Sequence, residues 1–385
     1  MQNERQRILK LVENGTISAQ EALTLLEALE NPTAQQSVVE EKKVEPAEEQ
    51  PKATSWFDDA MFEKKGDGAS PFDSMQAEFS KVGTRFVDII SSALNRVKDF
   101  DFPQVGATQF EHTYTFDSAA IQSIAVDVPH GSIAIEPATD ERITVKCAVK
   151  AGLRNEEETS LEETFLKRFV AEENGSTLRL ISDFKMMQVN MTLYVPQKDY
   201  EDITLKLLNG AVKLQQTSVQ TLRVKTYNGA ITVHGVTFKR LSAESSNGAI
   251  ELKQVKGRDA EVETMNGRVY IDGVIEDVDA KSLNGHVTVA TKTVFASKVK
   301  AETVAGNVEL YVPRNMSLKG KLVSNLGKVD VRLDDVAKHS DDQQFLQKAT
   351  SFEKEVPQTQ KLYIDGQTKA GSITVQYAPV EHTTV

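Results

Sequence analysis

The sequence is short of cysteine, of long apolar runs and of positive charge, and each shortage excludes a class of protein. Cys147 is the single cysteine, so an intrachain disulfide and a zinc–thiolate cluster are both excluded. No stretch approaches the roughly 18 apolar residues of a membrane span. The first residues also lack the apolar segment of a secretory signal. We therefore expect a cytoplasmic protein. The alternative is a cell-surface or membrane-associated protein without a classical signal.

Basic residues are outnumbered, since 45 Lys and Arg stand against 56 Asp and Glu and the net charge is −11. An acidic chain is a poor partner for the phosphates of nucleic acid. Near the N-terminus, Arg5, Arg7 and Lys10 are set against several glutamates. We therefore expect no nucleic acid partner.

Motifs that mark catalysis or ligand binding are also missing. The six histidines lack the spacing of metal ligands. The sequence contains no P-loop, no dinucleotide fingerprint and no nucleophile elbow. We predict no catalytic residue, no metal and no cofactor, and hence a protein that is not an enzyme.

The first third of the chain predicts three segments. Residues 1–31 read as a hairpin of two short helices, in which Ser18 and Glu21 form a capping box. A hairpin of this size buries little core alone, so we expect it to contact a protein partner. Residues 32–74 have the composition of a disordered linker.

A third segment, residues 75–100, is predicted to be an amphipathic helix. Its apolar face comprises Phe79, Val82, Phe86, Ile89, Ile90, Ala93, Leu94 and Val97. We expect this helix to cap the first coil of the domain that follows. The alternative is that residues 75–98 contact a membrane, the envelope or a partner helix, with Lys81, Arg85, Arg96 and Lys98 on the flanks.

From residue 110 to residue 380 the apolar period changes from helical to two, which predicts β-strands. Two insertions interrupt this domain, at 154–175 and 335–360. The first holds an acidic amphipathic helix candidate over 155–173, and the second is polar with weak helical character.

An Asn-Gly pair recurs within the domain at steps of 18 or 19 residues. The asparagines are Asn209, Asn228, Asn247, Asn266 and Asn284. The corner glycines are Gly210, Gly229, Gly248, Gly267, Gly285, Gly306 and Gly327, the last two without the Asn. The same pattern surrounds residues 128–137, with His130 in the Asn column, and residues 370–378, which we expect to close the series.

The repeat has two explanations. One Asn-Gly pair between alternating stretches is typical of a β-hairpin, so a meander or sandwich is one candidate. Apolar columns that stay in phase over successive pairs instead favour a parallel β-solenoid of about eight coils, each of about 19–21 residues, with Asn-Gly corners. We predict this mainly β solenoid. We also expect the Asn side chains to form a buried ladder, as Thr226 and Asn228 share one side of a strand.

Charged residues of both signs occupy an outward column of this solenoid. They are Lys225, Glu244, Glu263, Lys281 and Glu302. We expect a solvated ladder of ion pairs, each worth about 0–1 kcal/mol. The first alternative is a charged recognition strip. The second is a carbohydrate-active enzyme that uses Glu244 and Glu263, which would lie about 5 Å apart on adjacent coils.

The segment "RILKLVENGTISAQEALTLLEALE" and the repeats over 203–333 resemble the YvlB-like and LiaX-like proteins of Gram-positive bacteria. In that family a short SHOCT-like helical hairpin precedes an adhesin-type β-strand repeat domain. The resemblance implies a non-enzymatic binding and regulatory role in the cell-envelope stress response, connected with Lia-type signalling. A cell-surface adhesin or structural protein is the alternative. No oligomeric state is predicted.

Overall fold

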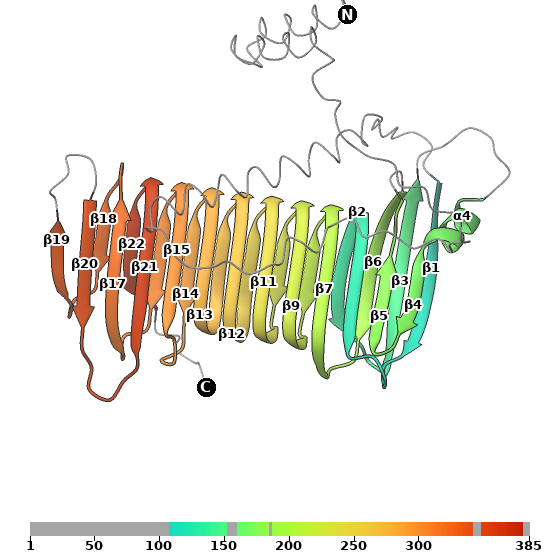
Figure 1. Ribbon diagram of the computed structural model, residues 1–385, viewed down its shortest axis with the longest axis horizontal. Coiled ribbons are helices and arrows are strands. Elements are labelled where there is room, and N and C mark those ends of the chain that lie inside the picture. Colours follow the sequence, from blue (N-terminus) through green and yellow to red (C-terminus); the bar gives the residue numbers. More distant parts are fainter. Residues whose placement is uncertain (1–107, 152–159, 185–186, 342–347, 380–385) are drawn as a thin grey trace, which may run out of the picture. The chain divides into compact units, whose positions relative to one another are not determined.

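The computed structural model describes four segments of the chain: 108–151, 160–184, 187–341 and 348–379. Most of these residues lie in β-strands (Figure 1). The hairpin expected at 1–31, the linker at 32–74 and the helix at 75–100 lie outside the described residues.

One coil of the domain consists of a long strand, an Asn-Gly corner and a short strand. The long strand β9 (Ser218–Asn228) pairs in parallel with β11 (Thr237–Asn247), and the short strand β10 (Ile231–His234) pairs in parallel with β8 (Val212–Gln215). The strands on the two sides of Gly229 therefore belong to two different sheets, and each bonds to neighbouring coils. The predicted parallel β-solenoid is confirmed, and the row of hairpins is wrong.

Two sheets result from stacking these coils. In stack order, the long-strand sheet comprises β4 (Val170–Asn174), β5 (Thr177–Ile181), the first half of β2 (Ser123–Pro137), β7 (Asp199–Asn209), β9, β11, the second parts of β12 (Ile250–Asn266) and β13 (Val269–Asn284), β15 (Lys298–Ala305), β21 (Lys361–Ala370), β17 (Ser317–Ser324), β20 (Lys348–Lys354) and β19 (Ala337–Asp341).

The short-strand sheet follows the same stack. It comprises β1 (Thr108–Asp117), β3 (Arg142–Ala151), β6 (Met187–Val195), the second half of β2, β8, β10, the first parts of β12 and β13, β14 (Val287–Thr291), β16 (Val308–Val312), β22 (Ile373–Tyr377) and β18 (Val329–Arg332).

The core lies between the two sheets and is continuous along the stack. Leu222 and Val224 enter it from β9, and Ile231 and Val233 from β10, each with 2% or less of its surface exposed. In-register parallel pairing places equivalent apolar residues next to one another, so each coil buries its neighbour's side chains.

The stack does not follow the sequence at its two ends. The coil formed by β21 and β22 lies between the coil of β15 and β16 and the coil of β17 and β18 (Figure 1). Residues 370–378 are therefore the last copy in the sequence, with Gly371 at its corner, but not the last coil of the stack. At the other end, β2 likewise lies between the coil of β5 and β6 and the coil of β7 and β8.

The first insertion holds a shorter helix than the sequence predicts. Helix α4 spans Leu161–Arg168 and begins at Ser160, whose hydroxyl accepts a hydrogen bond from the backbone N–H of Glu163. It ends at Phe169, after which the chain enters β4, antiparallel to β5. Phe165 and Phe169 stack with centroids 4.7 Å apart, so burial of these aromatic rings ends the helix and begins the strand.

The second insertion forms strands, so its predicted helical character is wrong. β19 and β20 pair antiparallel with each other, and β20 pairs antiparallel with β17. Phe352 of β20 is 1% exposed and lies opposite Gly320, where an added Cβ would be 2.1 Å from the ring. The inserted strands thus cover the edge that β17 would otherwise present to solvent.

Candidate binding face

The corner glycines stack in one continuous column. A Cβ added to Gly229 would lie 1.9 Å from the carbonyl oxygen of Gly210, and one added to Gly248 would lie 2.0 Å from that of Gly229. In stack order the column comprises Gly131, Gly210, Gly229, Gly248, Gly267, Gly285, Gly306, Gly371 and Gly327. Any side chain at a corner would collide with the backbone of the coil before it, which is why glycine recurs.

The five asparagines form a hydrogen-bonded ladder beside this column. The side-chain amide of each donates to the amide oxygen of the Asn one coil before it, at 2.6–2.9 Å. The pairs are Asn228 to Asn209, Asn247 to Asn228, Asn266 to Asn247 and Asn284 to Asn266. The amide of Asn209 lies 3.1 Å from Nδ1 of His130, so a histidine heads the ladder.

The ladder is not buried as the sequence analysis expected. Asn228, Asn247, Asn266 and Asn284 are exposed, and each is the last residue of its strand, directly before the corner glycine. The Thr or Ser two positions before each Asn occupies the interior position instead. Thr226 is 1% exposed and donates to the carbonyl of Gly210, and Ser245 donates to that of Gly229, both at 3.0 Å.

The outward column of charged side chains is less exposed to solvent than the sequence analysis expected. We call the side of the long-strand sheet that faces away from the core the outer face, and we call its residues Asp127, Lys206, Lys225, Glu244, Glu263, Lys281 and Glu302 the charged column. The Lys225 side chain is only 9% exposed and that of Glu302 only 2%. The expectation of solvation is therefore wrong for these two groups.

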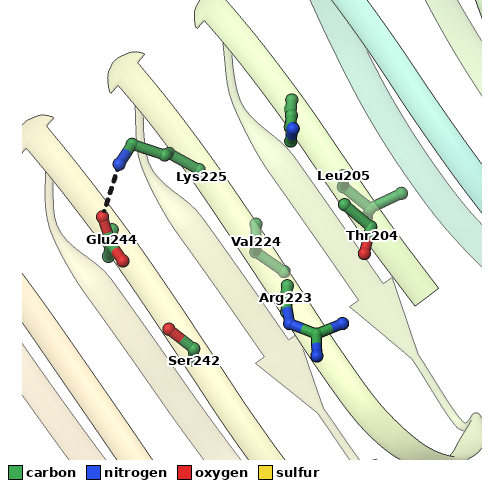
Figure 2. Close-up of a pocket in the computed structure, with 8 residues that line it drawn as sticks. Thr204, Leu205, Arg223, Val224, Lys225, Ser242 and Glu244 are labelled. Carbon is green, nitrogen blue, oxygen red and sulfur yellow. Dashed lines mark hydrogen bonds and ion pairs between the residues drawn. The ribbon is translucent and has the colours of Figure 1, made fainter. Parts of the chain in front are cut away.

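Ion pairs link the charged column across the strands. Nζ of Lys225 lies 2.7 Å from Oε2 of Glu244 on the next coil (Figure 2). Glu302 is instead paired within its own strand β15, where Nζ of Lys300 lies 3.1 Å from its Oε1. Burial raises the pKa of Glu302, against the lowering influence of Lys300 and Lys281. The outer face thus holds charge at a cost in solvation free energy.

A shallow hollow, too small to enclose a water molecule, lies on the same face. It is lined by Thr204, Leu205, Lys206, Arg223, Val224, Lys225, Ser242 and Glu244 (Figure 2). Glu263 is the cross-strand neighbour of Glu244, whose carboxylate is engaged by Lys225. The arrangement offers a mixed-charge surface for binding.

Sequence reasoning missed an apolar column beside the charged one. We call Leu208, Tyr227, Met265, Leu283 and Val304 the apolar column; Ser246 stands in the same row. Its apolar members are half-buried, and Ser246 is 2% exposed. The sequence contained the evidence for this column. Successive side chains of a strand point to opposite faces of the sheet, so these residues lie on the other face from the buried Thr and Ser side chains.

Other titratable groups lie apart from this face. Cys147 is buried in β3, as expected, and burial raises the pKa of its thiol to about 12. Within the four described segments, no group of three or more His, Cys, Asp or Glu residues is arranged to hold a metal ion. No helix in the described part of the chain is long and apolar enough to cross a membrane.

Comparison with known proteins agrees with this architecture. The family described as Toastrack DUF4097 matches residues 121–357, and a SHOCT-like domain matches residues 3–33. The chain belongs to the Toastrack DUF4097 family. The protein YvlB of Bacillus subtilis (strain 168) is 37% identical over 382 residues, which are 98% of this chain and 100% of YvlB. The resemblance drawn from the N-terminal segment and the repeats is thereby confirmed.

Solved structures that match this chain do so with low sequence identity. A candidate adhesin of Bacteroides fragilis NCTC 9343 is 14% identical, with a TM-score of 0.36, over 72% of this chain and 100% of that chain. A candidate lipid-binding protein of Parabacteroides distasonis ATCC 8503 is 12% identical, with a TM-score of 0.34, over 69% of this chain and 96% of that chain.

Proposed function

We propose that this protein is a non-enzymatic binding and regulatory protein of the bacterial cell-envelope stress response, acting in a Lia-type system. The solenoid is its recognition surface, and the SHOCT-like segment supplies a second contact with a protein partner. The resemblance to YvlB-like and LiaX-like proteins supports the stress-response role. We expect the protein in the cytoplasm.

The observation that carries the binding role is the outer face. It combines a charged column, an apolar column and a hollow on one parallel sheet. Apolar contacts supply affinity at an interface, and opposed charges set register and exclude wrong partners. Because β7, β9 and β11 are each bonded to neighbours on both sides, the face is held in one shape and costs little ordering on binding.

The test compares two charge reversals on opposite sheets. Arg223→Glu changes the hollow, whereas Lys213→Glu changes an exposed position on the short-strand sheet. Tagged proteins are captured from Gram-positive cells treated with a membrane-active antibiotic. We expect Arg223→Glu to lose partners that Lys213→Glu retains, and removal of residues 1–50 to lose a different set. Equal capture by all forms would contradict a role for the outer face.

Cell fractionation separates this proposal from the adhesin alternative. A regulatory protein of the cytoplasm remains with the cytosol, and an adhesin is accessible to protease added to intact cells. Surface accessibility of the β domain would replace the regulatory proposal by the adhesin.

A further inference from the structure

We propose that strand β1 is a dimer interface, at which it pairs antiparallel with β1 of a second copy of this chain across a two-fold axis. The pairing makes the short-strand sheets of the two copies continuous. The inference does not depend on the proposed function, because it concerns the end of the stack and not the outer face of the long-strand sheet.

β1 is an edge strand of ten residues. Among the described strands it is paired with β3 alone, over its full length from Thr108 to Asp117 (Figure 1). Its other side therefore presents a row of backbone N–H and C=O groups, about 34 Å long, that no described strand bonds. Such a row is a template for the addition of a further strand.

The other three edges of the two sheets, among the described strands, resist such pairing. They are β4 and β19, with five residues each, and β18, with four. All three carry charged side chains, in the sequences VAEEN, AKHSD and VDVR. Short length and charge are devices that keep edge strands from pairing with other molecules. β1 is at least twice as long, and its sequence TQFEHTYTFD contains no lysine, arginine or proline.

Half-buried aromatic side chains line the core side of β1. They are Phe110, His112, Tyr114 and Phe116. The ring of Phe110 packs edge-on against Phe165 of α4 at 5.4 Å, and that of Tyr114 stacks on Phe169 at 5.7 Å. Leu166 of α4, at the same end of the stack, is 44% exposed. This end thus presents apolar surface, and its burial against a second copy favours association.

The sequence of β1 is self-complementary in one antiparallel register. Directly opposed residues share a face of the sheet, so the aromatic side chains of two copies can meet across the strands. A register centred on Thr113 places Phe110 opposite Phe116 of the partner subunit and His112 opposite the partner's Tyr114, so that all four aromatic side chains are paired. A register centred on His112 would instead place Phe116 opposite Thr108 of the partner subunit.

The register centred on Thr113 also keeps like charges apart. Glu111 lies opposite Thr115 of the partner subunit, and Asp117 lies opposite the partner's Gln109, so no two carboxylates are directly opposed. Lys150 of β3 is the other neighbour of Gln109, which places it two strands, or about 10 Å, from Asp117 of the partner subunit. A strand from another protein also satisfies the backbone, but the match of β1 with itself favours a second copy.

Cysteine cross-linking of the full chain tests both the dimer and its register. Thr113 lies on the proposed axis and is exposed. Thr113→Cys therefore brings two thiols face to face, with Cα atoms about 4.5–5.5 Å apart, which suits a disulfide. Under mild oxidation we expect a disulfide-linked dimer of twice the 42.5 kDa of the chain. The native Cys147 is buried and does not compete.

Glu111→Cys is the matched control on the same strand. In the proposed register the two copies of position 111 lie four residues apart along the strands, or at least about 13 Å. We expect this variant to form no disulfide with itself. A mixture of Glu111→Cys and Thr115→Cys proteins should form a mixed disulfide, because these two positions are directly opposed.

A charge at the axis tests association without a cross-link. Thr113→Lys opposes two lysines across the interface. Thr232→Lys is the matched control on β10, which has a strand on each side in the same sheet. Sedimentation of the wild type should give the dimer mass. We expect Thr113→Lys to raise the Kd at least about tenfold, equivalent to about 1.4 kcal/mol, and Thr232→Lys to leave it unchanged.

A wild type that stays monomeric at the highest soluble concentration would overturn the proposal. Equal self-cross-linking of Glu111→Cys and Thr113→Cys would show contact without this register. A dimer that persists in Thr113→Lys, with circular dichroism equal to that of the wild type, uses another surface. Where Thr113→Lys does not fold, the absence of a cross-link in folded Thr113→Cys refutes the interface.

Discussion

The middle and the ends of this solenoid are built by different rules. From β7 to β14 each coil follows the previous one in sequence and lies on it in register, with the Asn ladder and the glycine column alongside. At each end one coil is placed out of sequence order. Antiparallel strands finish both ends of the long-strand sheet and the β1 end of the short-strand sheet. A repeated coil is stable where it has an equivalent coil on each side. A terminal coil faces solvent on one side and therefore needs a different structure to cover it.

The out-of-order coils tie the ends to distant parts of the chain. β21 bonds to β15 on one side and β17 on the other, so the end coil cannot separate by peeling off in sequence order. The short, polar strand β19 then forms the edge, which discourages pairing with other molecules. The middle depends on close stacking, and the ends depend on side-chain packing and long-range strand pairing.

The middle can be broken at a single corner. We expect Gly248→Ala to lower the free energy of unfolding by about 4 kcal/mol or more, because its Cβ would lie 2.0 Å from the carbonyl oxygen of Gly229. The coils of Gly229 and Gly248 must then move apart, which breaks the hydrogen bond from the N–H of Gly229 to the carbonyl of Asn247. Urea unfolding followed by circular dichroism measures the change.

Gly175→Asn is the matched control. Gly175 lies in the turn between β4 and β5 with φ of 62°, and an added Cβ meets nothing within 4 Å. Asn tolerates this conformation, so we expect a loss of no more than about 1 kcal/mol. A similar loss in the two variants would refute the close stacking of the corners.

An end can be broken through its aromatic cluster. Phe165→Ala removes a fully buried ring from between Phe110, Phe169 and Phe184, and we expect a loss of about 3–5 kcal/mol. Hydrogen exchange should show loss of protection in β1 and β4, with β11 and β12 unchanged. The exposed Phe295 provides the control, since Phe295→Ala should cost less than about 0.5 kcal/mol. Loss of protection throughout the stack would show that the ends and the middle unfold as one unit.

The ladder of the middle coils should have a smaller effect. Asn247→Ala removes one donated and one accepted hydrogen bond, both at 2.8 Å, but the site is exposed and water replaces them. We expect a loss of about 1 kcal/mol, measured by urea unfolding beside Gly248→Ala. A loss above about 3 kcal/mol would indicate that the amides are desolvated, as their burial would require.

How much the sequence could predict follows the same division. In the middle, each corner needs a glycine that fits against the carbonyl of the preceding coil. The regular spacing of these glycines in the sequence therefore predicted the coils. At the ends, the position of β21 between β15 and β17 depends on contacts between residues far apart in sequence. Alternation of apolar residues is the same in either order, so it carries no information on the order of the coils.

The candidate binding face was only half visible in the sequence. The charged column followed from the period, because Lys225 and Glu244 occupy equivalent positions. Its burial could not follow, since burial depends on what lies above the sheet. Asn228 was placed inside by continuing the strand's alternation to its last residue, where the side chain is exposed beside the corner.

The smallest predicted effect concerns His130, which lies where the end coil meets the middle coils, and tests whether its protonation weakens that junction. This residue heads the Asn ladder, it is 7% exposed, and burial lowers its pKa. The unfolded chain therefore binds a proton more readily, so stability is full above the unfolded pKa and is lost as the pH falls below it toward the folded value. His130→Asn extends the ladder with a group that does not titrate in this range. We expect the two proteins to have near-equal melting temperatures at pH 7.5 and His130→Asn to melt at the higher temperature at pH 5. The difference in the free energy of unfolding at pH 5 should be smaller than the roughly 1 kcal/mol expected for Asn247→Ala. Thermal unfolding of both proteins between pH 5 and pH 7.5 gives the comparison, and parallel curves would show that protonation of His130 does not weaken the end coil.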